Sequence, residues 1–302
     1  MRRLLGYRRG IRADDGPPAP TIDPNSIPDL TMWFDAANAS SVTFGMGTNV
    51  ASIANLASGY TSYKMSTEGV ASREPAYLAT GLNGKGCIEF TQLNSQYLRL
   101  CDAANVVQPP NVVWGSANYP FTMIVVAFYD APTTNFTGPD VPGAYSGATT
   151  TALPYFGEAV FGMRATFGIV PKAGGAQPTL YATIYTAEAV AAPGPVRYIV
   201  TSDPTNQTRM SVFSQAAVAA PGTADFTLRE NSVLKGTIAG QQVLTTILGS
   251  TSYPWSMGRG YPGALPAYHF KGKVGEILFY ERALNASEVS SLEAHLTNKW
   301  GL

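Results

Sequence analysis

Two glutamates near the C-terminus, Glu276 and Glu281, come nearest to the spacing of a catalytic pair. Two carboxyl groups flanking one glycosidic bond supply the acid and the base or nucleophile of glycoside hydrolysis. The segment EILFYE has the composition of a strand, however, and residues five apart on a strand face opposite sides of the sheet. Leu278, between them, supplies no third acid to tune their pKa values. We therefore expect no catalytic residues here, with Glu276 meeting solvent or a backbone partner and Glu281 pairing with Arg282.

An aromatic segment upstream has the composition of a carbohydrate site. Its aromatic residues surround one arginine: Tyr253, Trp255, Arg259, Tyr261 and Tyr268. Aromatic rings stack on sugar faces, and a guanidinium group donates hydrogen bonds to hydroxyl groups. These five residues are the candidate glycan-binding set. The alternative, that the aromatic side chains fill the core and the bases of loops, stays open.

The other residues that could do chemistry form no catalytic set. His269 and His295 are the only histidines and lack a metal-binding spacing, so His295 is expected on a helix surface. No nucleophile elbow or phosphate-binding loop is present. Cys87 and Cys101 lie on neighbouring predicted strands and could meet across a hairpin, but reduced, partly buried thiols are expected for a protein assembled in the cytoplasm. We predict that the chain is not an enzyme.

Residues 1–28 form a basic, proline-rich arm. Five arginines fall within its first twelve residues: Arg2, Arg3, Arg8, Arg9 and Arg12. Prolines then exclude a helix or a central strand. Alone in water this segment buries too little apolar surface to offset its chain entropy, so we expect it to become ordered by anchoring to a partner protein through its arginines. Packing on its own body and binding of nucleic acid are the alternatives.

Composition favours one large β domain over residues 29–302. Only 13% of the residues are charged, and 30 Gly and 22 Pro mark many turns between short apolar runs. The net charge is zero, so no global field attracts nucleic acid or an anionic membrane. No apolar run has the length of a secretion signal or a membrane span, so we expect synthesis in the cytoplasm without a signal peptide.

Short apolar runs rich in β-forming residues predict the strands that must position these side chains. The runs are Gly86–Phe90, Tyr97–Leu100, Phe121–Tyr129, one or two within Tyr155–Val170, Tyr181–Thr186, Val196–Val200, Thr208–Phe213, Gln242–Leu248 and Val274–Tyr280. We expect Val196–Val200 and Thr208–Phe213 to form a hairpin. Val274–Tyr280 is expected to be buried on both faces.

A helix with clear end signals follows the last strand. Asn285 and Glu288 form a capping box, and Lys299 and Gly301 suit the last turn and the residue after it. The apolar stripe repeats at helical spacing through Val289, Leu292 and Leu296. The pattern therefore predicts a helix that begins and ends at defined residues.

The order of four segments resembles that of the concanavalin A-like, laminin-G-like jelly rolls of phage and bacterial surface proteins. Phe270–Leu302 resembles their C-terminal strand and helix, and LTMWFDAANASSVT from Leu30 to Thr43 resembles their opening strand. EPAYLATGLNGKGCIEFTQLNSQYLRL from Glu74 to Leu100 is similar to their first long hairpin, and PFTMIVVAFYDAP from Pro120 to Pro132 to the next strand. The resemblance implies an all-β, concanavalin A-like jelly-roll sandwich with one short C-terminal α-helix and an extended N-terminal arm.

The same resemblance bears on two kinds of site. Some glycosidases with this sandwich carry a strand signature of Glu, any residue, Asp, two residues, Glu, and Leu278 replaces the middle acid, so glycosidase activity is only a remote alternative. Some family members bind calcium, for which the loop residues Asp102, Asn105, Asp130 and Asp140 could serve. Their spacing does not match a dedicated ligand loop, so calcium stays unproven and no cofactor is expected.

The resemblance and the arm together predict a structural virion surface protein of a tailed phage. It would be a capsid decoration, cement or head-fibre subunit, located in the virion and anchored to other capsid or tail proteins. The alternative is a tail-fibre or receptor-binding module that recognises a host surface glycan. A homo-oligomer, in one form a trimer, is expected, and nucleic acid and membranes are not expected partners.

Overall fold

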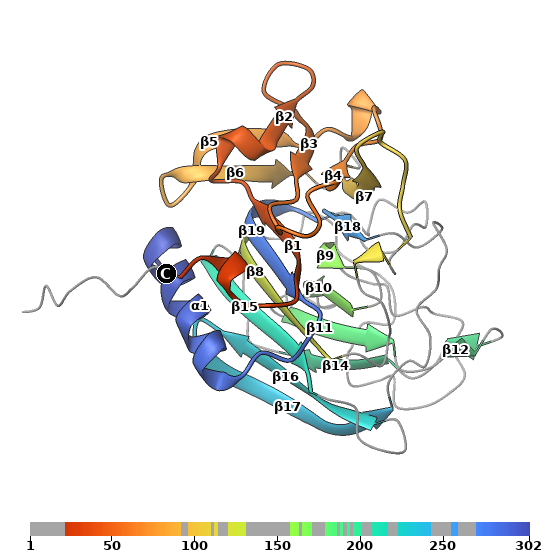
Figure 1. Cartoon of the computed structure of the whole chain (residues 1–302), viewed down its shortest axis with the longest axis vertical. Helices are drawn as coiled ribbons and strands as arrows, with labels where there is room; N and C mark the ends of the chain where they lie inside the picture. Colours follow the sequence, from red (N-terminus) through yellow and green to blue (C-terminus); the bar gives the residue numbers. More distant parts are fainter. Residues whose placement is uncertain are drawn as a thin grey trace, which may run out of the picture.

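Two large antiparallel β-sheets make up most of the part of the chain that the structure describes (Figure 1). The computed structural model describes residues 22–91, 96–109, 112–113, 120–130, 207–216, 223–242, 255–258 and 270–302, together with the strand backbones at 158–162, 165–170, 179–185, 188–189, 192–193 and 196–200. The sheets and the C-terminal helix confirm the predicted all-β sandwich with one short C-terminal helix.

The eight-stranded sheet is built around the two most buried strands. Its order is β17 (Val233–Gln242), β16 (Thr223–Glu230), β15 (Gln207–Gln215), β8 (Phe121–Tyr129), β19 (Gly272–Tyr280), β6 (Lys85–Phe90) and β5 (Ala76–Leu82), and β1 (Leu30–Asp35) also pairs with β19. Strand β19 pairs with β6 through its first residues and with β1 through its last. A bulge between Val274 and Glu276 separates these two stretches of β19.

The nine-stranded sheet combines the β2–β4 meander, which lies near the N-terminus, with strands from the middle of the chain. Its order is β14 (Val196–Val200), β11 (Thr179–Tyr185), β10 (Ala165–Val170), β9 (Glu158–Gly162), β18 (Ser256–Met257), β7 (Leu98–Asp102), β4 (Tyr63–Ser66), β3 (Val50–Ala54) and β2 (Val42–Phe44). Strands β12 (Glu188–Ala189) and β13 (Ala192–Pro193) pair separately. Short 3-10 helices form at η1 (Pro24–Ser26), η2 (Ala39–Ser41) and η3 (Ala71–Arg73).

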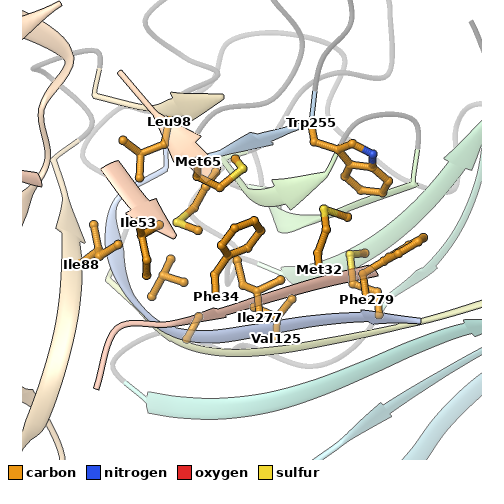
Figure 2. Packing of buried hydrophobic residues seen from close by; sticks show 14 of the residues in the cluster. Met32, Phe34, Ile53, Met65, Ile88, Leu98, Val125, Trp255, Ile277 and Phe279 are labelled. Atoms are coloured by element: carbon orange, nitrogen blue, oxygen red, sulfur yellow. The ribbon is translucent and has the colours of Figure 1, made fainter. Parts of the chain in front are cut away.

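The main core lies between the two sheets. Alternate residues of β1, β8 and β19 meet side chains from the facing sheet, including Met65, Leu98 and Trp255 (Figure 2). The intervening residues of β8 and β19 face a second apolar cluster. Because both faces of β19 are covered, the prediction that Val274–Tyr280 is buried on both sides is confirmed.

Helix α1 (Ala286–Trp300) covers the second face of the eight-stranded sheet (Figure 1). It buries Leu292, Leu296 and Trp300 against Leu278 and Tyr280 of β19. The predicted end signals are confirmed, because both hydrogen bonds of the Asn285–Glu288 capping box form and Gly301 adopts φ 66° after the last turn. In the described part of the chain no helix is both long and apolar enough to cross a membrane.

The expected hairpin between Val196–Val200 and Thr208–Phe213 is wrong. Both segments are strands, but β14 pairs with β11 in the nine-stranded sheet and β15 pairs with β8 and β16 in the other. Adjacent strands in a jelly roll often cross between sheets, and local composition does not report that choice. The strand expected at Gln242–Leu248 lies outside the described residues apart from Gln242, which ends β17.

The end of the predicted arm packs on the body. Ile27 is buried in the cluster beneath α1, and the Tyr280 hydroxyl donates a hydrogen bond of 3.2 Å to the carbonyl of Pro24. The five arginines of the arm lie outside the described residues. Their role as a partner anchor therefore stays a prediction.

Candidate functional site

Trp255, a candidate for stacking on a sugar, lies in the core. It is fully buried, and its ring meets that of Phe279 edge-on with centroids 5.0 Å apart. Its carbonyl accepts a hydrogen bond from the amide of Leu100, which fixes the entry into β18. A ring with no exposed surface cannot stack on a sugar, so the alternative that this aromatic fills the core holds for Trp255. Tyr253, Arg259, Tyr261 and Tyr268 lie outside the described residues.

Glu276 is held in a closed cluster between β19, β1 and α1. It is 1% exposed, and its carboxylate accepts hydrogen bonds from Trp33 Nε1 (2.8 Å), Trp300 Nε1 (2.8 Å) and Lys299 Nζ (2.7 Å). Lys299 Nζ also lies 2.7 Å from the carboxylate of Asp35, the Cα partner of Glu276 on β1. The expectation that Glu276 meets solvent or a backbone group is wrong, because the partners come from side chains far apart in the sequence.

The electrostatics of this cluster follow from its burial. Burial raises the pKa of Glu276, and the neighbouring charge of Asp35 acts in the same direction, whereas Lys299 and Trp300 lower it. Every bond to the carboxylate comes from a donor, so the ionised form satisfies all three partners. The cluster therefore ties α1 to both strands. It leaves Glu276 no exposed surface with which to reach a glycosidic bond.

The principal partner of Arg282 is Glu288 and not Glu281, the neighbour with which it was expected to pair. Its guanidinium group makes a bidentate pair with Glu288 and lies 3.5 Å from Asp29. Glu281 follows the end of β19, and its amide donates to the carbonyl of Asp29. The arginine thus supports the start of α1 through the capping glutamate.

The side chain of His295 on α1 is half-buried, whereas the sequence predicted a residue on the helix surface. Burial and the charge of Lys299 both lower the pKa of His295. Its neutral form is therefore favoured in the fold. His269 lies outside the described residues.

Two of the residues considered for calcium already serve their own loops. The Asp102 carboxylate accepts hydrogen bonds from the amides of Ala104 and Val106 and from the side chain of Gln108. Asn105 Oδ1 accepts a 2.9 Å hydrogen bond from the Ser66 hydroxyl. Among the described side chains, no three His, Cys, Asp or Glu residues gather as metal ligands. Asp130 directly follows β8, and Asp140 lies outside the described residues.

Cys87 and Cys101 are free and lie in different sheets, on β6 and β7. The hairpin across which they could have met does not form, because β6 pairs with β5 and β19 whereas β7 pairs with β4 and β18. Both thiols are free, as predicted, but they are fully buried instead of partly buried. Burial raises the pKa of Cys87 to about 11 and that of Cys101 to about 12.

We expect both thiols to resist modification in the folded protein. At pH 8 neither group is appreciably ionised, and the thiolate is the form that reacts. An aromatic disulfide reagent should therefore label the native chain very slowly and label 2 thiols at once in denaturant, followed by absorbance. Rapid labelling of either native cysteine would contradict the burial of both thiols.

The outer face of the nine-stranded sheet carries polar side chains around β7. Leu98 and Leu100 belong to the core between the sheets, so Arg99 between them points to the opposite face. Its Cα partners on the neighbouring strands are Ser66 on β4 and Ser256 on β18. This face lies on the side of the molecule away from α1, which covers the other sheet.

Two arginines converge on one glutamate at this face. Nη1 of Arg73 and Nη1 of Arg99 each donate a 3.1 Å hydrogen bond to Oε1 of Glu68. The two guanidinium carbons lie 4.8 and 5.0 Å from the ring centroid of Tyr97. The side chains of Arg73 and Arg99 are 29% and 20% exposed, and that of Glu68 is 22% exposed. We call Arg73 and Arg99 the arginine pair.

The sequence carries only part of the signal for this site. The alternation of Leu98, Arg99 and Leu100 indicates an outward arginine. Arg73 and Glu68 stand in a 3-10 helix and a turn well before β7, and only the pairing of β4 with β7 brings them beside it. Sequence reasoning missed the arginine pair for that reason.

No protein-family model matches this sequence, and no curated protein matches it. Among solved structures, the binding domain of Paraclostridial Mosquitocidal Protein 1 is similar, with 13% identity and a TM-score of 0.51 over 90% of this chain and 52% of that chain. A Trypanosoma rangeli sialidase has 13% identity and a TM-score of 0.42, over 90% of this chain and 33% of that chain. A botulinum neurotoxin type C structure, described by its interaction with two ganglioside molecules, has 11% identity and a TM-score of 0.42, over 82% and 51%. The chain spans about half the length of the mosquitocidal domain and shares its β-sandwich fold.

Proposed function

We propose that this chain is a non-catalytic recognition module that binds a glycan through the outer face of its nine-stranded sheet. The observation that carries the proposal is the partly exposed arginine pair beside β4 and β7. A guanidinium group presents five N–H donors in a rigid plane, and sugars present many oxygen acceptors. The face is held by paired strands, so its donors are positioned before a ligand arrives.

Two further observations support binding over hydrolysis. The acid that the sequence placed nearest to a glycosidase pair, Glu276, is buried and accepts three hydrogen bonds. The fold is also that of a domain whose name describes it as a binding domain. Glycan recognition was also predicted from the sequence, as the alternative to a structural virion role.

The virion hypothesis stays a prediction. The five arginines that would anchor the chain lie outside the described residues, and the similar mosquitocidal binding domain is not a phage virion protein. Location in a virion and assembly as a homo-oligomer likewise remain predictions. A glycan-binding module on a particle surface would satisfy both hypotheses.

A glycan array probed with the full-length chain tests the proposed function. We expect binding to a defined group of glycans without release of sugar from the ligand. Amide hydrogen exchange should then slow in the turn at 67–70 and the loop at 102–107, and stay unchanged in β16 and β17. Failure to bind any neutral or acidic glycan would overturn the proposal, as would measured cleavage of a glycosidic bond.

A further inference from the structure

The charge balance around the arginine pair leaves a positive excess. Among the described residues joined by these hydrogen bonds, Arg73 and Arg99 bring two positive charges and Glu68 brings one negative charge, which gives a net charge of +1. The excess is therefore centred on the two guanidinium groups.

Another acid close in sequence, Glu74, forms no ion pair with Arg73 or Arg99 in the described part of the chain. Glu74, next to Arg73, is buried, and its Oε2 accepts a 3.1 Å hydrogen bond from the amide of Met46. Among the described residues, the carboxylate to which the arginine pair donates is that of Glu68 alone. Each guanidinium group donates one N–H to Glu68, so further N–H donors of both groups remain available to a ligand.

Tyr97 fixes the orientation of the pair. Its ring is buried and lies within 5.0 Å of both guanidinium carbons, and its amide donates a 3.2 Å hydrogen bond to the carbonyl of Arg73. A guanidinium that lies on a ring keeps its N–H groups at its edge, where they can meet an acceptor. Tyr97 itself has too little exposed surface to contact a ligand.

Glu68 reaches the pair from a tight turn. Glu68 and Gly69 have φ of 60° and 78°, and the amide of Val70 donates to the carbonyl of Thr67 across the turn. A glutamate in the left-handed region is uncommon and costs local free energy. The strained turn holds one carboxylate against two guanidinium groups. An incoming carboxylate or sulfate would accept hydrogen bonds from the same two groups in the same way.

We infer that the arginine pair binds an anionic substituent, a carboxylate or a sulfate, on the glycan that this module recognises. The inference rests on the proposed function, because the ligand is the glycan bound at the same face. Charge-assisted hydrogen bonds from guanidinium to an oxyanion are short and strong, and a planar fork suits the two oxygens of a carboxylate. Glu68 then acts as a positioning residue that holds one N–H group of each arginine, while its negative charge repels an incoming anion.

The test compares an acidic oligosaccharide with its carboxyl-reduced form, which differs only in the anionic group. Titration calorimetry with the full chain should give tighter binding of the acidic form and a dissociation constant that rises with salt. Sulfated, uronate-bearing and sialate-bearing ligands in separate arms distinguish the source of the anion. Equal affinity for the acidic and reduced forms would overturn the inference and leave the proposed function standing.

Variants assign the effect to the arginine pair. Arg73→Gln and Arg99→Gln should each weaken binding of the acidic ligand about tenfold or more, since a hydrogen bond to a charged group is worth roughly that factor. Glu68→Gln should instead tighten it, because the amide keeps an oxygen acceptor for both arginines and removes the negative charge that repels the anion. A purely structural ion pair predicts no gain in that variant, so weaker or unchanged binding by Glu68→Gln would overturn the inference.

Lys273→Gln is the matched control on the other sheet. Lys273 also lies over an aromatic ring, 5.2 Å from the centroid of Phe128, and 4.0 Å from a carboxylate, that of Glu89. Its replacement should leave the affinity unchanged. Thermal unfolding of every variant separates loss of binding from loss of fold, and Arg99→Lys, which keeps the charge and loses the fork, should fall between wild type and Arg99→Gln. An equal loss of affinity in the Lys273 variant would count against the assigned site.

Discussion

Glu276→Ala is expected to lower the free energy of unfolding by about 3–5 kcal/mol, as for other buried pairs that lose one partner. The change leaves the part-buried indole N–H of Trp33 and the buried indole N–H of Trp300 without their acceptor and removes one of the two carboxylates that neutralise Lys299. Denaturant unfolding followed by tryptophan fluorescence measures the loss. The matched control is Glu89→Ala, which removes a carboxylate from the neighbouring strand β6 where the side chain is 31% exposed, and should cost about 1 kcal/mol or less. Equal costs for the two variants would refute the cluster.

The pH dependence of the same residue has a defined sign. Burial raises the pKa of Glu276 in the folded chain, so over the interval between its unfolded and folded values the native state binds more protons than the unfolded state. This contribution to stability is present below the unfolded pKa and is lost as the pH rises through the folded one. The difference in unfolding free energy between wild type and Glu276→Gln should therefore shrink as the pH rises across that interval. Growth of this difference with pH would contradict the direction of the shift.

Trp255→Ala should destabilise the chain by about 3–5 kcal/mol, the usual cost of truncating a buried aromatic side chain. The ring is fully buried between the sheets and packs on Phe279, so its loss opens a cavity at the start of β18. Chemical denaturation measures this cost.

Trp255→Phe separates the packing role of Trp255 from a role in binding. Phenylalanine keeps part of the volume, so the variant should remain folded with a smaller loss of stability and an unchanged affinity for glycan. A folded Trp255→Phe variant that no longer bound glycan would restore the aromatic-stacking hypothesis and contradict the structure.

Local sequence signals proved accurate where neighbours along the chain decide the conformation. The Asn285–Glu288 capping box, the stripe through Leu292 and Leu296, and Gly301 set both ends and the buried face of α1. Strand β8 was predicted to the residue, because a continuous apolar run of β-forming side chains admits burial on both faces. These patterns depend on contacts within one element or between successive residues.

Pairings between distant segments could not be found in this way. The sequence around Val196–Phe213 suits a hairpin, yet β14 and β15 enter different sheets. The aromatic composition around Trp255 suits a sugar site equally well as a core, and its burial depends on Phe279, which lies in a different strand. Local composition reports neither the sheet that a strand joins nor the burial of Trp255.

The sequence by itself determined the β-rich sandwich, the buried last strand and the capped C-terminal helix, because period, capping and turn chemistry act over a few residues. Only the tertiary structure decided that Glu276 is a buried link between β19, β1 and α1, and that Arg73 and Arg99 meet at Glu68 over Tyr97. The physical reason is that side-chain burial and charge pairing depend on which strands become neighbours, and that choice is made by packing of the whole sandwich.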